Sequence, residues 1–168
     1  MPPKLLALIG ITLLISTVVT AQDFTVPPLP QTKEEYIKSE LDLIAAARWL
    51  EANPMGNLKQ KTIEVNAYVL KWITDSPTVG LEIDADLIVK LYEDNTQLMM
   101  VFMAGYTRYC LENNYSKDKL KAYTAGIKSS LNCYALGGET KKNKLLSKAI
   151  EADKEGKLGE WVEEKMKK

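Results

Sequence analysis

The stretch LMMVFMAGYTRYC, residues 98–110, decides the fold, because its first half is apolar on every face. A helix that is hydrophobic all round is buried in a protein core or in a membrane. This stretch is shorter than the roughly 20 apolar residues that span a bilayer, and Arg108 interrupts its far end. The sequence therefore predicts a central buried helix that starts at Asn95 or Thr96. Gly105 has no side chain, so a second helix can pack closely against this point.

The first predicted helix lies upstream of the central one and covers residues 32–52. Thr32 and Glu35 have the spacing of a capping box, and the turn-forming sequence NPMG at residues 53–56 ends the helix. Its apolar residues occupy two neighbouring faces, and we expect both faces to be buried. One face carries Leu43, Ala47 and Leu50, and the other carries Ile37, Leu41 and Ile44.

Two more helices are predicted between these elements. Asn57 is expected to cap the second helix, which ends at Ser76-Pro77. Its apolar stripe consists of Leu58, Val65, Val69 and Trp72. Residues 78–83 predict an irregular connector, because one short extended stretch has no partner with which to form a sheet. The third helix is short, starts at Asp84 or Asp86, and carries Leu87, Ile88 and Leu91.

Downstream of the central helix, Ser116 is expected to cap a fifth helix that ends at Gly137-Gly138. Residues 139–168 predict two short helices separated near Gly156. The sequence has no fixed repeat period, which disfavours a regular solenoid. These patterns predict an all-α fold, a compact bundle-like or orthogonal array of about five main helices plus short C-terminal helices.

The N-terminal region predicts export from the cytoplasm. Residues 1–21 have the layout of a signal peptide, with Lys4 before a mostly apolar run and a cleavage site near Ala21. An uncleaved membrane anchor is the alternative, but polar residues interrupt the run. Residues 22–31 contain three prolines and predict an extended, exposed spacer, and residues 32–168 then form a single helical domain. We expect a periplasmic or secreted protein without stable membrane insertion after signal cleavage.

Composition excludes several classes of function. The chain has no histidine, which excludes catalytic triads with an imidazole base, histidine-containing zinc sites and histidine-ligated haem. Two cysteines cannot form a four-thiolate zinc site. The formal net charge of zero predicts no electrostatic attraction to nucleic acid, and the lysines of the later part of the chain are expected to form a solvated helical face. We predict no cofactor, no metal and no catalytic residue.

The acidic residues Glu82, Asp84, Asp86 and Glu93 have part of the spacing of a calcium-binding loop. The loop requires a glycine at its sixth position, where this chain has Leu87. Acidic caps at the start of a helix explain these residues better.

The candidate ligand-binding residues are Arg108, Tyr106 and Tyr109, which lie together on the otherwise apolar central helix. Arg108 could clamp an anionic ligand in a pocket. The alternative is an ion pair with Glu112 or with a glutamate from a neighbouring helix.

The two cysteines, Cys110 and Cys133, are predicted to be free, buried thiols. If the central helix and the fifth helix form an antiparallel hairpin, Cys110, near the end of the central helix, faces the first turns of the fifth helix. Cys133 lies about 25 Å further along the fifth helix, at 1.5 Å per residue. A disulfide requires Cα atoms within about 7 Å. A disulfide remains the alternative, because an exported chain meets an oxidising compartment.

Several short stretches resemble those of small secreted helical proteins from Bacteroidetes-type bacteria, a group without an assigned activity. They are Arg48-Trp49-Leu50, Glu64-Val65-Asn66-Ala67, Ser76-Pro77-Thr78-Val79 and Glu112-Asn113-Asn114-Tyr115-Ser116. The resemblance implies a periplasmic or extracellular location and no catalytic residue.

The sequence favours a non-enzymatic helical module that binds a protein, a peptide or a small apolar ligand. The second hypothesis is a hydrolase that uses two carboxylates without histidine, one of them with a raised pKa. Glu64, Glu112 and Asp86 are its candidate acids.

Overall fold

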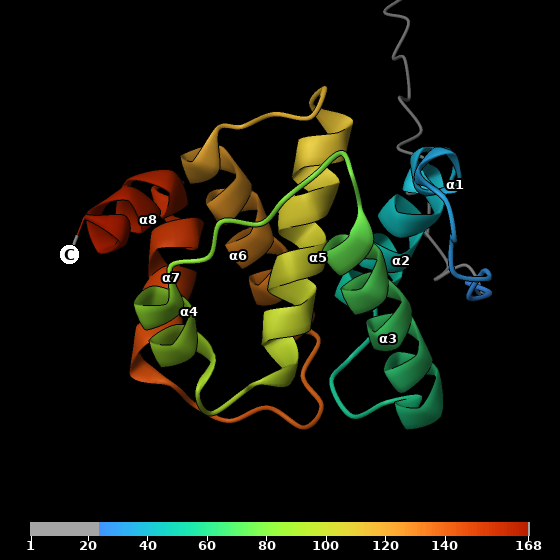
Figure 1. Ribbon diagram of the computed structural model, residues 1–168. Helices are drawn as coiled ribbons and strands as arrows, with labels where there is room; N and C mark the ends of the chain where they lie inside the picture. Colours follow the sequence, from blue (N-terminus) through green and yellow to red (C-terminus); the bar gives the residue numbers. More distant parts are fainter. Residues whose placement is uncertain (1–23, 168) are drawn as a thin grey trace, which may run out of the picture.

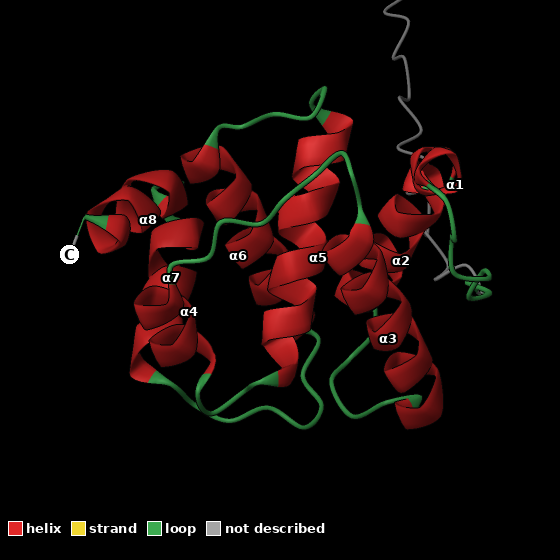
Figure 2. Ribbon diagram, viewed as in Figure 1, coloured by secondary structure: helices red, strands yellow, loops and turns green. Residues whose placement is uncertain are grey.

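The computed structural model describes residues 24–167 and confirms the all-α fold (Figures 1 and 2). This part of the chain contains eight helices and no strand, and the helices pack against each other in a compact array. They are α1 (Lys33–Lys38), α2 (Glu40–Ala52), α3 (Lys59–Asp75), α4 (Ala85–Tyr92), α5 (Gln97–Glu112), α6 (Lys119–Ala135), α7 (Lys144–Lys154) and α8 (Leu158–Met166). The predicted signal peptide, residues 1–21, lies outside the described residues.

Helix α5 is the centre of the array, as the sequence predicts, and it contacts α2, α3, α4 and α6. It forms an antiparallel hairpin with α6 (Figure 1). A Cβ atom added at Gly105 would lie 3.2 Å from the Cα atom of Gly126, so the two backbones meet at a pair of glycines. The expected close approach at Gly105 is therefore confirmed.

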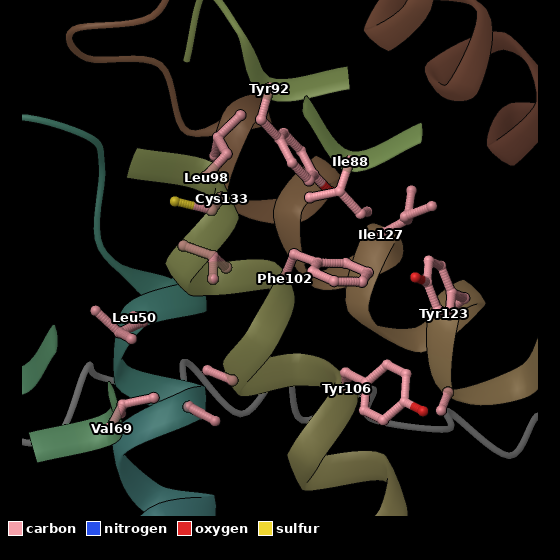
Figure 3. Packing of buried hydrophobic residues seen from close by; sticks show 14 of the residues in the cluster. Leu50, Val69, Ile88, Tyr92, Leu98, Phe102, Tyr106, Tyr123, Ile127 and Cys133 are labelled. Carbon is pink, nitrogen blue, oxygen red and sulfur yellow. The ribbon is translucent and has the colours of Figure 1, made fainter. Parts of the chain in front are cut away.

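An aromatic cluster fills the core on one side of this hairpin. Figure 3 shows Phe102 of α5 among three tyrosines from α4, α5 and α6. The ring centroid of Phe102 lies 6.0 Å from Tyr92, 6.2 Å from Tyr106 and 5.3 Å from Tyr123. Aromatic pairs at these distances stabilise a core beyond the apolar area that they bury.

The predicted first helix is two helices, because the chain bends at Ser39 between α1 and α2. The capping box of Thr32 and Glu35 is confirmed at the start of α1. The Ser39 hydroxyl donates a hydrogen bond to the Tyr36 carbonyl (3.0 Å) and accepts one from the indole N–H of the buried Trp72 (2.8 Å). These bonds satisfy the polar groups at the bend, so the interruption costs little free energy.

One of the two apolar faces of this region is not buried. Leu43, Ala47 and Leu50 lie in the core, as expected. In contrast, Leu41 is 77% exposed and Ile37 is 44% exposed. Ile44, the third residue of this face, is half-buried. The prediction of two buried faces was therefore wrong for Ile37 on α1 and Leu41 on α2, whose side chains no described helix covers.

The predicted helix starts differ from the structure at two positions. Leu58, in the left-handed region with a φ of 45°, replaces Asn57 as the residue before α3. Asp118 replaces Ser116 as the cap of α6, and its carboxylate accepts a hydrogen bond from the Lys121 backbone N–H (3.0 Å). The Ser116 hydroxyl instead accepts a hydrogen bond from the Asp118 backbone N–H (3.2 Å), so Ser116 belongs to the turn before the helix.

The sequence left two possible starting residues for α4 and two for α5, and the structure shows which of them begins each helix. Asp84 caps α4, and its carboxylate accepts a hydrogen bond from the Leu87 backbone N–H. Thr96 precedes α5, while the Asn95 amide exchanges two hydrogen bonds with the backbone of Lys141. Asn95 therefore attaches the loop before α7 to the start of α5.

The connecting segments agree in part with the predictions made from the sequence. Residues 78–83 form no helix or strand, and Gly156, with a φ of 72°, separates α7 from α8 as expected. Residues 24–31 are also irregular, but Pro30 is buried and Phe24 and Val26 pack against the core. The described part of the predicted spacer is therefore not fully exposed.

Candidate functional site

Arg108 lies at the junction of three helices, where its guanidinium is already paired. Its Nη1 atom lies 2.8 Å from a carboxylate oxygen of Glu51 on α2, and Nη2 donates to the Ser129 hydroxyl on α6 at 3.4 Å. Glu112, one turn further along α5, lies 3.8 Å from Nε. The ion-pair alternative for Arg108 is thus the one observed.

Further contacts extend this network. The Asn132 amide donates to the second oxygen of Glu51 at 2.6 Å, and Arg48 pairs with Glu112 at 2.8 Å. The side chains of Arg108 and Glu51 are 21% and 18% exposed, so both charges are largely removed from water. This partly buried network joins α2, α5 and α6, and each carboxylate oxygen of Glu51 already has a partner within the protein.

The two candidate tyrosines lie elsewhere. Tyr106 is buried against Phe102 and Tyr123, and its burial raises the pKa of the phenol to about 12. Tyr109 is partly buried and lines a surface groove. Arg108 is one position from Tyr109 and two from Tyr106, so its side chain points in a different direction from both. The two tyrosines are three positions apart, but Tyr106 packs in the buried aromatic cluster whereas Tyr109 lines the surface groove. The structure does not bring the three side chains together in one pocket.

The groove beside Tyr109 lies between α6 and the α7–α8 turn, and we name it the α6–α8 groove. It is a shallow groove, largely open to solvent, with a volume of about 550 Å³. It is lined by Tyr109, Leu120, Lys121, Thr124, Ala125, Lys128, Asp153, Gly156, Leu158 and Gly159.

Small residues keep this groove open. Gly156 ends α7 in the left-handed region, and Gly159 follows in the first turn of α8. A Cβ atom added at Gly159 would have the Thr124 hydroxyl as its nearest neighbour, at 3.9 Å. The space that a side chain at position 159 would take is therefore part of the groove.

The lining of the groove is mostly apolar and includes three charged side chains. Leu120 and Leu158 provide apolar surface. Among the charged residues, the Lys128 ammonium lies 2.7 Å from the Asp153 carboxylate, and this ion pair links α6 to α7. Lys121 pairs with Asp118 at the start of α6. Apolar walls with a few polar groups at defined positions are typical of ligand sites.

A second groove, between α7 and α8, is of similar size, about 570 Å³. Its lining is mostly charged, and it includes ion pairs such as Lys157 with Glu155 and Lys165 with Glu164. Trp161 is its one aromatic residue. The α6–α8 groove offers more apolar surface for a ligand.

The candidate acids of the hydrolase hypothesis do not converge. Glu64 lies on the exposed side of α3 and accepts a hydrogen bond from Gln60. Asp86 lies on α4, and Glu112 pairs with two arginines. None of the three lines the α6–α8 groove. Glu51 is the acid that sequence reasoning missed, although its position four residues after the buried Ala47 places it beside the apolar face of α2.

Cysteine and acidic side chains provide no further site in the described residues. Cys110 and Cys133 are free and buried, as predicted. Burial raises the pKa of both thiols, to about 11 for Cys133, where the Glu51 carboxylate adds to the effect. No cluster of three or more potential metal ligands occurs in residues 24–167.

No protein-family model matches this chain, and neither a curated protein nor a solved structure matches it significantly. Among the described helices, none has the length and apolar character needed to cross a bilayer.

Proposed function

We propose that this chain is a secreted or periplasmic, non-enzymatic binding module that holds a small apolar ligand in the α6–α8 groove. The supporting observation is the groove itself, about 550 Å³ with a mostly apolar lining, in which Gly159 leaves space that a side chain would fill. Both lysines of the groove are paired with carboxylates, Lys121 with Asp118 and Lys128 with Asp153, so apolar surface is the main feature that the groove offers a ligand.

The arrangement of the acidic residues gives the hydrolase hypothesis less support than the binding hypothesis. Glu51 and Glu112 lie near one another, but both pair with Arg108 and neither lines the groove. A carboxylate-dependent hydrolase needs two acids that reach the same substrate atoms. We therefore place binding ahead of catalysis.

The test is a substitution at Gly159 that fills the groove with a side chain. In Gly159→Phe the added ring occupies the groove, whereas Gly159→Ala adds only a methyl group that the 3.9 Å distance to Thr124 accommodates. The probe is 1-anilinonaphthalene-8-sulfonate, which combines an apolar body with one sulfonate. We expect Gly159→Ala to bind it as the parent chain does and Gly159→Phe to bind it at least about tenfold more weakly, since the apolar contact surface is lost.

A matched control distinguishes the groove from other surfaces. Ala152 lines the charged groove between α7 and α8, so Ala152→Phe adds the same ring nearby without filling the α6–α8 groove. Fluorescence titration of all four proteins, with circular dichroism to verify folding, gives the comparison. Equal binding by the parent chain and by folded Gly159→Phe would refute the proposed site.

A further inference from the structure

The outer face of α3 carries an apolar stripe that no described element covers. Helix α3 packs against α2 and α5 through Val65, Val69 and Trp72, all of which are fully buried. On its opposite face, Ile63 is 62% exposed and Leu70 is 50% exposed.

The exposed residues form one continuous line along the helix. Ile63, Ala67, Leu70 and Thr74 are all exposed and are separated by four, three and four positions. Alternating steps of four and three place residues on a single seam, which is the spacing of helices that pair side by side. The smallest side chain, Ala67, lies near the middle of the line.

Two opposite charges flank one side of this seam. Glu64 directly follows Ile63, and Lys71 directly follows Leu70, so both side chains lie on the same side of the stripe. Both are exposed, and Lys71 pairs with Asp75 one turn further along the same helix. The charges have opposite signs at nearly equal distances from Ala67, four residues to Lys71 and three to Glu64.

We infer that two copies of this chain associate through the outer faces of their α3 helices, antiparallel, with the two-fold axis near Ala67. A two-fold rotation at Ala67 places Ile63 of one copy against Leu70 of the second copy, within about one 1.5 Å helical rise of exact register. The same rotation places Glu64 against Lys71 of the second copy, twice per dimer. Ala67 faces Ala67 at the axis, where small side chains let the helices approach.

The position of α3 makes this pairing accessible. The helix lies at one edge of the molecule, and α7 and α8 lie at the opposite edge (Figure 1). Association through α3 therefore leaves the α6–α8 groove open, and the two proposals stand independently. A seam of one helix per chain is small for an interface, so we expect a weak dimer with a dissociation constant on the order of 100 µM.

The test reverses, one at a time, the sign of the two charges that the two-fold axis brings together. Glu64→Lys alone and Lys71→Glu alone each create like-charge pairs across the axis, and each is expected to weaken dimerisation by roughly tenfold. When the two single variants are mixed, both cross-axis pairs become attractive, so a heterodimer should form. Sedimentation equilibrium on the full chain, from about 10 µM to 1 mM, measures each combination.

A hydrophobic control completes the design. Ile63→Arg replaces one of the two large apolar side chains of the seam by a charge, opposite Leu70 of the second copy, and should abolish dimerisation. Leu41→Arg replaces the highly exposed leucine of α2 and should leave dimerisation unchanged. A chain that is monomeric at 1 mM would overturn the inference. So would a dimer that persists in folded Ile63→Arg, or single charge variants that fail to form a heterodimer on mixing.

Discussion

The positive charge of Arg108 lies between three helices, and its contribution to the stability of the protein depends on the carboxylate of Glu51. The two residues are 57 positions apart in the chain and 2.8 Å apart in space. Each of them is about one-fifth exposed. Removal of one partner leaves the other charge largely desolvated, and this is more destabilising than the loss of a surface pair.

At this residue scale we predict that Arg108→Met lowers the free energy of unfolding by about 2–3 kcal/mol, because Glu51 loses its cation. Arg48→Met is the control: Arg48 pairs with Glu112 but is 66% exposed, and its loss should cost less than about 1 kcal/mol. Urea unfolding followed by circular dichroism measures both. Equal losses for the two variants would contradict a structural role specific to Arg108.

Sequence reasoning located Arg108 but not its surroundings. An arginine on an otherwise apolar helix signals a buried partner or a ligand, and helical spacing named Glu112 as one partner. The main partner, Glu51, comes from a helix whose crossing point with α5 no local pattern encodes. The same limit applies to the α6–α8 groove, since Gly159 and Thr124 become neighbours only after folding.

At the scale of the elements, the α5–α6 hairpin depends on the absence of side chains where the helices cross. A Cβ atom added at Gly126 would lie 2.7 Å from the Phe102 carbonyl oxygen, which is closer than real side chains approach. This oxygen belongs to the backbone of the central helix and cannot rotate away. The crossing point therefore requires glycine for steric reasons.

We predict that Gly126→Ala destabilises the protein by about 2–3 kcal/mol, even though alanine favours helix by about 1 kcal/mol relative to glycine. Gly80→Ala serves as the control, because nothing lies within 4 Å of a Cβ atom at Gly80 and its φ is not left-handed. That change should alter stability by less than about 0.5 kcal/mol. Thermal unfolding compares the two variants, and a Gly126→Ala protein as stable as its parent would refute the close approach.

At the scale of the whole molecule, buried cysteine and tyrosine side chains with raised pKa values make the stability of the fold depend on pH in the alkaline range. Burial raises the pKa of Cys133 to about 11 and those of Tyr68 and Tyr106 to about 12. In the unfolded chain these groups ionise at their ordinary pKa values, which are lower. The unfolded state therefore releases protons first, and stability falls as the pH rises from the unfolded towards the folded pKa values.

We predict that the free energy of unfolding is nearly constant from pH 7 to pH 8 and decreases between about pH 9 and pH 11. Cys133 alone should account for about 2 kcal/mol of the decrease, since a shift of one pKa unit corresponds to about 1.4 kcal/mol. Cys133→Ala should lose correspondingly less stability over the same pH interval. Urea midpoints at pH 7, 9 and 10.5 measure the difference, and parallel curves for the two proteins would contradict it.

The sequence by itself determined the all-α class, the central position of α5 and several helix ends, because these follow from hydrophobic periodicity, caps and breakers within a few residues. It also indicated free thiols, from the distance along a helix. Tertiary structure alone decided that Ile37 and Leu41 stay exposed, that Glu51 meets Arg108, and that a groove opens beside Gly159. The physical reason is that periodicity states which side chains share a face, whereas the packing of the whole chain decides which faces obtain a partner.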